Sequence, residues 1–192
     1  VQQHREKLKY QTELVKSVCA NFESPTIVSL ACGSSRDLEQ AQAEIKKAKA
    51  RVILVDFDEQ ALKESKQRLS FIQDQLDIFL TDIRKLPKIF KSLNGRSHFI
   101  YAGGLFDYLP DGTIRILIRS LSEFVSQGLF LFTNIAKPNP YRGLIETAGN
   151  WALIERSEEE MLDFLSLTKG RRELKKDQTG LTWLATSNNQ RR

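Results

Sequence analysis

The sequence predicts a three-layer α/β fold with a doubly wound, mostly parallel seven-stranded sheet that ends in an antiparallel hairpin. Short apolar runs alternate with segments of helical periodicity along most of the chain, which is typical of strands buried between helices. Near the end, two runs of alternating polar and apolar residues flank a short turn at Gly180, and this pattern indicates a hairpin. With 192 residues and 41% hydrophobic content, the chain is long enough for one substantial core.

The elements follow one another in a regular order. The first helix is expected over residues 4–21, before the break at Pro25. The remaining pattern predicts strands at 26–31, 51–55, 76–80, 97–102 and 128–133, with helices at 37–50, 59–70, 83–93 and 112–126 between them. The helix at 83–93 is expected to be short because Pro87 interrupts it. Further helices are expected at 141–148 and 157–167, and the hairpin strands at 171–177 and 181–186.

Composition restricts the class of protein. No run of about eighteen apolar residues occurs and no secretion signal begins the chain, so we expect no membrane span and a cytoplasmic location. Two cysteines, Cys19 and Cys32, and two histidines, His4 and His98, lack the spacing of metal ligands, so we expect no metal. The net charge of +5 is weak evidence for a nucleic-acid partner because the basic residues are dispersed among acids.

The residues at the carboxyl ends of the predicted strands are the candidates for a binding site, because ligands of open α/β sheets bind there. These residues are Ala31, Cys32, Gly33 and Ser34 at the end of the first strand, Asp56 and Phe57 at the second, Asp82 and Ile83 at the third, and Ala102 and Gly103 at the fourth.

Gly33 and Asp56 are the most informative members of this set. Glycine allows a ligand to approach the backbone closely, and a carboxylate about 20 positions later suits a pair of ribose hydroxyls. Asp56 could instead cap the next helix, but Asp58 is available for that, so we favour the ligand role. Asp82 could accept from the exocyclic amine of adenine, with the Ile83 amide facing the ring, or could cap the turn that follows it.

Residues 27–35, Ile-Val-Ser-Leu-Ala-Cys-Gly-Ser-Ser, and 52–56, Val-Ile-Leu-Val-Asp, resemble the first two motifs of the class I S-adenosylmethionine-dependent methyltransferases. The resemblance covers most of the chain, terminal hairpin included. It implies that S-adenosylmethionine is the cofactor and that the strand-end residues bind it. Three positions differ from the family pattern: Ser29 stands where an acid is usual, and Ala31 and Ser35 stand where glycines are usual. We therefore expect an altered contact to the amino-acid end of the cofactor.

A narrower resemblance is to the bacterial methyltransferases of extracellular-factor synthesis, which are tied to 3-hydroxy fatty acid methyl esters. It lies in residues 102–109, Asn134, Asn139-Pro140, Arg142, Glu146 and 151–156. The implied acceptor is the carboxylate of a small molecule, which is ionised at neutral pH and needs no general base. The sequence identifies no catalytic residue, and Tyr108, Tyr141 and Arg142 are the substrate-side candidates. Arg142 could clamp a carboxylate or pair with Glu146 one helical turn later.

We expect a single methyltransferase domain over residues 1–192. Its parts would be an N-terminal helix (1–24), a cofactor-binding half (25–134), and substrate-side helices with the terminal hairpin (135–192). The first residue is Val1 rather than methionine, which leaves room for an upstream domain. The sequence does not indicate an oligomeric state.

Three other functions were weighed. The charge and Asn139-Pro140-Tyr141 suggest a nucleic-acid methyltransferase, but in amino-methylating enzymes the similar motif follows the fourth strand, and here it follows the fifth. A nicotinamide-dependent dehydrogenase is disfavoured because the G-x-G-x-x-G fingerprint is missing. A non-catalytic module that binds an adenosyl group stays open because of Ser29 and Ser35.

Overall fold

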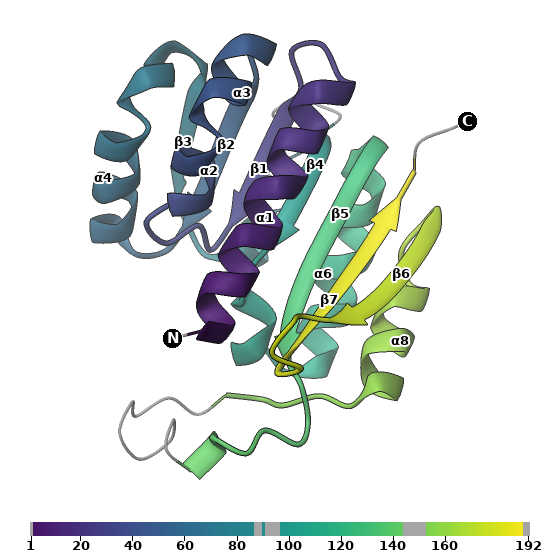
Figure 1. Ribbon diagram of the computed structural model, residues 1–192. Helices are drawn as coiled ribbons and strands as arrows, with labels where there is room; N and C mark the ends of the chain where they lie inside the picture. Colours follow the sequence, from purple (N-terminus) through teal and green to yellow (C-terminus); the bar gives the residue numbers. More distant parts are fainter. Residues whose placement is uncertain (1, 87–89, 91–96, 144–152, 190–192) are drawn as a thin grey trace.

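The structure is a computed structural model that describes residues 2–86, 90, 97–143 and 153–189. It contains a seven-stranded sheet in the order β3-β2-β1-β4-β5-β7-β6 (Figure 1). The strands are β1 (Thr26–Leu30), β2 (Arg51–Asp56), β3 (Leu76–Leu80), β4 (Ser97–Ala102), β5 (Val125–Ile135), β6 (Arg171–Lys176) and β7 (Thr182–Asn188). All neighbouring pairs from β3 to β5 are parallel, whereas β7 runs antiparallel to both β5 and β6. The predicted fold class is therefore confirmed.

Helices cover both faces of the sheet. They are α1 (Gln2–Asn21), α2 (Arg36–Gln40), α3 (Gln42–Ala48), α4 (Glu59–Arg68), α6 (Asp111–Phe124) and α8 (Glu158–Ser166), with short 3₁₀ turns η1 (Ser70–Gln75), η2 (Ile83–Lys85) and η3 (Leu105–Tyr108). In Figure 1, α1 to α4 lie in front of the sheet, and α6 and α8 lie behind it.

The strand alternation produces one apolar core on each face. Ile27 of β1 packs with residues of α1 to α4, whereas its neighbour Val28 packs with residues of α6 and α8. In α6 the buried residues Ile114, Leu117, Ile118 and Leu121 recur at helical spacing, which explains why this segment is a helix with one apolar face. An ion pair between Arg115 of α6 and Asp163 of α8 joins the two helices on that side.

Local signals define where two helices begin. The Asp58 carboxylate accepts hydrogen bonds from the amides of Gln60 and Ala61, so Asp58 is the N-cap of α4. Ser157 and Glu160 form a reciprocal capping box at the start of α8. Both caps are short polar side chains before an amphipathic segment, and the helix starts predicted at 59 and 157 agree with them to within one residue.

Some boundaries differ from the predictions. The helix expected at 37–50 is divided into α2 and α3 at Ala41, where the backbone departs from helical geometry (φ −99°, ψ 18°). The break left no trace in the apolar pattern because Leu38, Ala41 and Ile45 keep helical spacing and are all buried. β5 is longer than residues 128–133 at both ends. Of the predicted helices at 83–93 and 141–148, most residues lie outside the described ranges.

The last strand of the sheet, β6, lies at its edge and is strongly charged. Its residues Arg171, Arg172, Glu173, Lys175 and Lys176 are exposed, and its outer side pairs with no described strand. Separately, none of the helices in the described ranges combines the length and apolar character needed to cross a lipid bilayer.

Candidate functional site

The carboxyl ends of the four parallel strands β1 to β4 meet at one edge of the sheet. Leu30 at the end of β1 is level with Val55 of β2 and with Ala102 of β4, and the amide of Thr81 donates to the Asp56 carbonyl oxygen at 2.8 Å. The residues at and just beyond these ends, 31–35, 56–57, 81–83 and 102–104, are called the rim below. All ten residues proposed from the sequence for cofactor binding lie in the rim.

Asp56 joins the first two strand ends of the rim. One carboxylate oxygen, Oδ2, accepts from the Gly33 amide at 3.0 Å, and the other, Oδ1, accepts from the Asp58 amide at 3.1 Å. The side chain is largely buried, with 7% of the residue exposed. Each carboxylate oxygen can accept a second hydrogen bond, so Asp56 is fixed by the backbone and keeps acceptor capacity.

The turn after β1 has an unusual backbone. Ala31, Gly33 and Ser35 all have φ close to +50°, in the left-handed region. For alanine and serine this conformation costs about 1–2 kcal/mol each, so surrounding contacts must compensate for it. Ala31 and Ser35 thus adopt the backbone conformation that glycine adopts readily, although neither residue is glycine.

Ser65 of α4 is a residue of this turn that the sequence analysis missed. Its hydroxyl donates to the Gly33 carbonyl oxygen at 2.7 Å and accepts from the Ser35 hydroxyl at 2.9 Å, and the side chain is fully buried. These bonds hold the left-handed residues in place. A lone serine within a helix offered no motif, although its place on the apolar face of α4 beside Leu62 was a usable signal.

The space beside Gly33 is open. A Cβ atom placed on Gly33 would meet no atom within 4 Å, and Phe57, directly after Asp56, is 79% exposed. Burial and the nearby Asp56 charge raise the pKa of the Cys32 thiol in the same turn to about 12, which disfavours its thiolate form. The turn therefore leaves open space beside the Gly33 backbone, and an exposed aromatic residue follows Asp56.

At the end of β4 the rim is covered by α1. A Cβ atom on Gly103 would lie 1.8 Å from Gln11 Nε2, and one on Gly104 would lie 2.9 Å from Lys7 Nζ. Side chains of α1 therefore lie directly against this backbone, and only glycine leaves room for Gln11. The sequence analysis named Gly103 but neither of the α1 residues.

The substrate-side candidates lie in two separate segments, after β4 and after β5. Tyr108 is 54% exposed at the end of η3, and Tyr141 is 55% exposed after β5. The Tyr141 amide donates to the Asn139 side-chain oxygen at 2.9 Å, and the Arg142 amide to the Asn139 carbonyl oxygen at 3.2 Å. The expected alternative pairing of Arg142 with Glu146 involves a residue outside the described ranges.

Asp107 of η3, which directly precedes Tyr108, is buried. Its Oδ1 accepts from the Ile135 amide at 2.7 Å, which links the segment after β4 to the end of β5. Burial raises the pKa of Asp107 from 3.8 to about 6, against the opposing charges of Lys7 and Arg156. Asp107 thus holds the end of β5 against η3.

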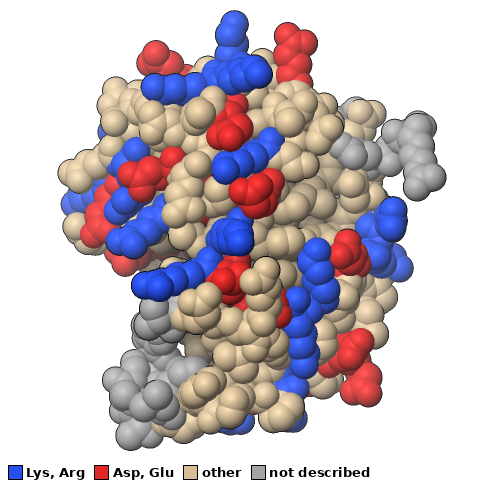
Figure 2. All heavy atoms as spheres, viewed as in Figure 1, with Lys and Arg blue, Asp and Glu red and all other residues tan. Residues whose placement is uncertain are grey.

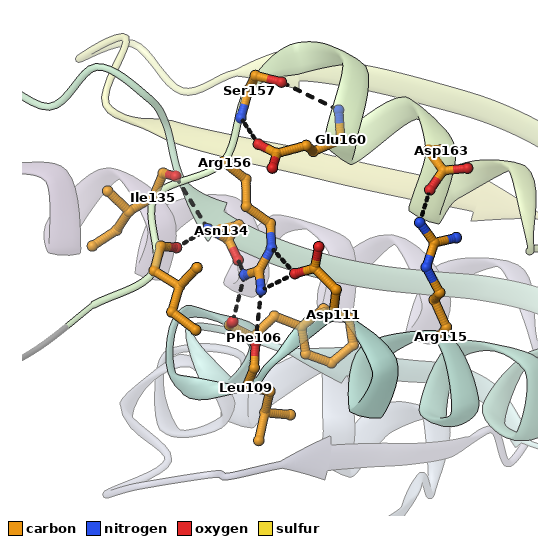
Figure 3. A network of polar contacts seen from close by, with 11 residues as sticks. Phe106, Leu109, Asp111, Arg115, Asn134, Ile135, Arg156, Ser157, Glu160 and Asp163 are labelled. Carbon is orange, nitrogen blue, oxygen red and sulfur yellow. Dashed lines mark hydrogen bonds and ion pairs between the residues drawn. The ribbon is translucent and has the colours of Figure 1, made fainter.

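Arg156 connects the elements of the substrate side (Figure 3). It is 1% exposed, and its guanidinium donates to the carbonyl oxygens of Phe106 and Leu109 at 2.8 and 2.7 Å, and to the Asn134 side-chain oxygen at 2.5 Å. It also pairs with Asp111 at 2.9 Å. One buried cation therefore ties together η3, the start of α6 and the end of β5.

The charged residues do not form a single basic surface on the face that Figure 2 shows. Lysine and arginine side chains there are interspersed with aspartate and glutamate. Within the described ranges, no three His, Cys, Asp or Glu side chains gather closely enough to hold a metal ion.

Comparison with known proteins gives a result for structure and none for sequence. No family model and no curated protein matches the chain. A possible exported protein from Bordetella parapertussis has a TM-score of 0.76 and 14% identity, over 97% of this chain and 68% of its own. An O-methyltransferase family protein from Burkholderia thailandensis has a TM-score of 0.75 and 12% identity, over 96% and 56%.

A third similar structure is geranyl diphosphate C-methyltransferase from Streptomyces coelicolor A3(2), solved with Mg²⁺, geranyl diphosphate and S-adenosyl-L-homocysteine. It has a TM-score of 0.69 and 11% identity, over 94% of this chain and 80% of its own. The chain has a methyltransferase-like α/β fold. At these identities the likeness concerns the fold alone, and the chain spans about half the length of the Burkholderia protein.

Proposed function

We propose that this chain binds S-adenosylmethionine at the rim and transfers its methyl group to a small-molecule acceptor. The observation that carries the proposal is the placement of Asp56, whose carboxylate is held against the Gly33 turn beside an open space. A fixed carboxylate with remaining acceptor capacity suits the paired hydroxyls of a ribose.

The other rim residues suit the remaining parts of an adenosyl compound. Phe57 would offer its exposed ring to one face of the adenine. The Thr81 amide donates to the Asp56 carbonyl oxygen, so the Asp82–Ile83 turn that follows lies near Asp56 and suits the edge of the base. The backbone of residues 31–34 and of Ala102 and Gly103 would then hold the amino-acid end. Beside Gly33, no side chain of the described residues occupies the space where this end would lie.

The chemistry asks little of the protein beyond positioning. The cofactor supplies a methyl group already activated by a sulfonium, so the chain has to align the acceptor and exclude water. For the acceptor we propose the carboxylate of a hydroxy fatty acid, which is ionised at neutral pH and needs no base. Tyr108, Tyr141 and Arg142, in the segments after β4 and β5, would orient it.

A nucleic-acid acceptor has less support. The strand order assigns Asn139-Pro140-Tyr141 to the segment after β5, whereas β4 is followed by Gly103 and Gly104. The mixed charges in Figure 2 also offer no continuous track for a phosphate backbone.

Calorimetry with S-adenosylhomocysteine tests the cofactor site. Asp56→Ala should weaken binding by about 1–3 kcal/mol, because hydroxyls lose their charged acceptor. Asp58→Ala is the matched control, because the Asp58 carboxylate, like that of Asp56, accepts hydrogen bonds from two backbone amides, here those of Gln60 and Ala61. It should cost about 1 kcal/mol of folding stability and leave the affinity unchanged.

Three outcomes would count against the proposal. An unchanged dissociation constant in Asp56→Ala would refute the role given to Asp56. Absence of heat with both S-adenosylmethionine and S-adenosylhomocysteine for the wild-type protein would refute adenosyl binding altogether. If the cofactor binds, transfer of a labelled methyl group to 3-hydroxydecanoate tests the acceptor, and label found only on added RNA or DNA would overturn it.

A further inference from the structure

One face of α1 carries polar side chains toward the substrate end of the sheet. Gln3, Lys7 and Gln11 are four residues apart and therefore lie along the same side of the helix. Gln3 Nε2 donates to the Leu181 carbonyl oxygen at 3.0 Å and to the Thr182 hydroxyl at 2.8 Å. The first turn of α1 is thus anchored to the start of β7, and this anchor also fixes the helical turns that follow.

Lys7 and Gln11 lie over the end of β4. Their terminal nitrogens lie 2.9 and 1.8 Å from the positions that Cβ atoms of residues 104 and 103 would take. The two adjacent glycines therefore allow an ammonium group and an amide group to lie close to the rim. Neither group is part of the sequence motifs that indicated the cofactor site.

Gln11 has an unsatisfied donor. The residue is 6% exposed, and its Nε2 is buried with no hydrogen-bond partner. Burying an unpaired amide costs about 1–3 kcal/mol, and buried polar groups in native proteins nearly always have a partner. An acceptor supplied by a ligand at this end of β4 would satisfy this donor.

Charges of both signs lie near Lys7. Burial, followed by the charges of Lys7 and Arg36, lowers the pKa of His4, so both cations lie within electrostatic range of His4. The Asp107 carboxylate is also near, with its Oδ2 3.6 Å from the Cβ position of residue 104, but the ion pairs found among the described residues do not include a Lys7–Asp107 pair. A positive charge beside a buried amide donor is the combination that recognises a carboxylate.

We propose that Lys7 and Gln11 form a carboxylate-binding site over Gly103 and Gly104. The inference rests on the proposed function for its ligand, since the carboxylate belongs either to the amino-acid end of the adenosyl cofactor or to the methyl acceptor. Both sources offer the same chemistry, and the choice of probe distinguishes them.

The test compares Lys7→Met and Gln11→Leu with Lys9→Met, an exposed lysine on the same helix, as the matched control. Calorimetry uses two adenosyl probes: S-adenosylhomocysteine, and 5′-methylthioadenosine, which keeps the adenosine and the thioether but lacks the amino-acid end. It also uses two acceptor probes, 3-hydroxydecanoate and its methyl ester. In one of the two pairs, loss of a charge-assisted contact should weaken binding of the probe that carries the carboxylate about tenfold or more. Binding of the probe without the carboxylate should weaken less than twofold.

A drop for S-adenosylhomocysteine alone assigns the site to the cofactor, and a drop for 3-hydroxydecanoate alone assigns it to the acceptor. Unchanged affinities for all probes in both variants overturn the proposal, as do equal losses with and without the carboxylate. Wild-type protein that binds neither adenosyl probe refutes the proposed function instead.

Thermal unfolding separates ligand recognition from packing. Gln11→Leu removes a buried unpaired amide, so its melting temperature should equal or exceed that of the wild type. A clear decrease, with unaltered binding of all four probes, would mean that Gln11 serves the packing of α1 on β4.

Discussion

Replacing Arg156 with methionine should destabilise the protein more than any other single change near the rim. Methionine replaces only the unbranched stem of the side chain and leaves three oxygens without their donor, on Phe106, Leu109 and Asn134. Each buried oxygen left unpaired costs about 1–3 kcal/mol, and such losses are not fully additive. We therefore expect a loss of about 3–5 kcal/mol, a large share of the roughly 5–15 kcal/mol that stabilises a typical domain.

Asp111→Asn is the matched control for this prediction. Its carboxylate pairs with the same guanidinium, but the Asp111 side chain is 52% exposed, so water can solvate what remains. The control should cost about 1 kcal/mol or less. Urea unfolding measures both values, and the slope with denaturant should stay constant. A loss below about 1 kcal/mol for Arg156→Met, or an equal loss for the control, would refute the reasoning.

Two further predictions concern pH and the turn after β1. The pKa of Asp107 is higher in the folded than in the unfolded chain, so the folded state retains its proton between about pH 4 and 6, and stability from this group falls as pH rises through that window. Asp107→Asn keeps the acceptor for the Ile135 amide, and it should reduce this pH-dependent loss of unfolding free energy by up to about 3 kcal/mol. Unfolding curves measured at pH 4 and pH 7 test this, and an equal change between the two pH values in wild type and variant would contradict it. Ser65→Ala should cost about 2 kcal/mol, and adding Ser35→Ala should then cost little more, because the two hydroxyls share one hydrogen bond; fully additive losses would show that they act independently.

The fold was predictable because its determinants are local. Each strand of the parallel part is a short apolar run, and the hairpin carries Gly180 in a left-handed conformation (φ 73°) at its turn. Alternation and periodicity are properties of neighbouring residues, and they sufficed for seven strands in their observed positions. The division of one predicted helix at Ala41 was not predictable in this way, because a backbone change that keeps the same residues buried does not alter the pattern.

The site was predictable only where it follows from strand ends. Asp56 ends β2 and Gly33 lies in the turn after β1, and parallel topology brings such residues together. Lys7, Gln11 and Ser65 belong to helices and reach the rim through packing between elements distant in the chain. Arg156 was indicated by the sequence only as the last residue of the segment 151–156 that resembles a known family. Its burial could not be foreseen, because a lone arginine is ordinarily exposed.

The charged edge strand β6 restricts how this chain can meet other chains. An open sheet edge offers unpaired amides and carbonyls to any extended segment nearby, and closely spaced charges on such an edge make that pairing unfavourable. Because Arg171, Arg172, Lys175 and Lys176 on β6 would face the same charges on a second copy, continuation of the sheet from molecule to molecule through this edge is discouraged. The basic residues that raise the overall charge thus help to keep the hairpin from acting as a template for aggregation.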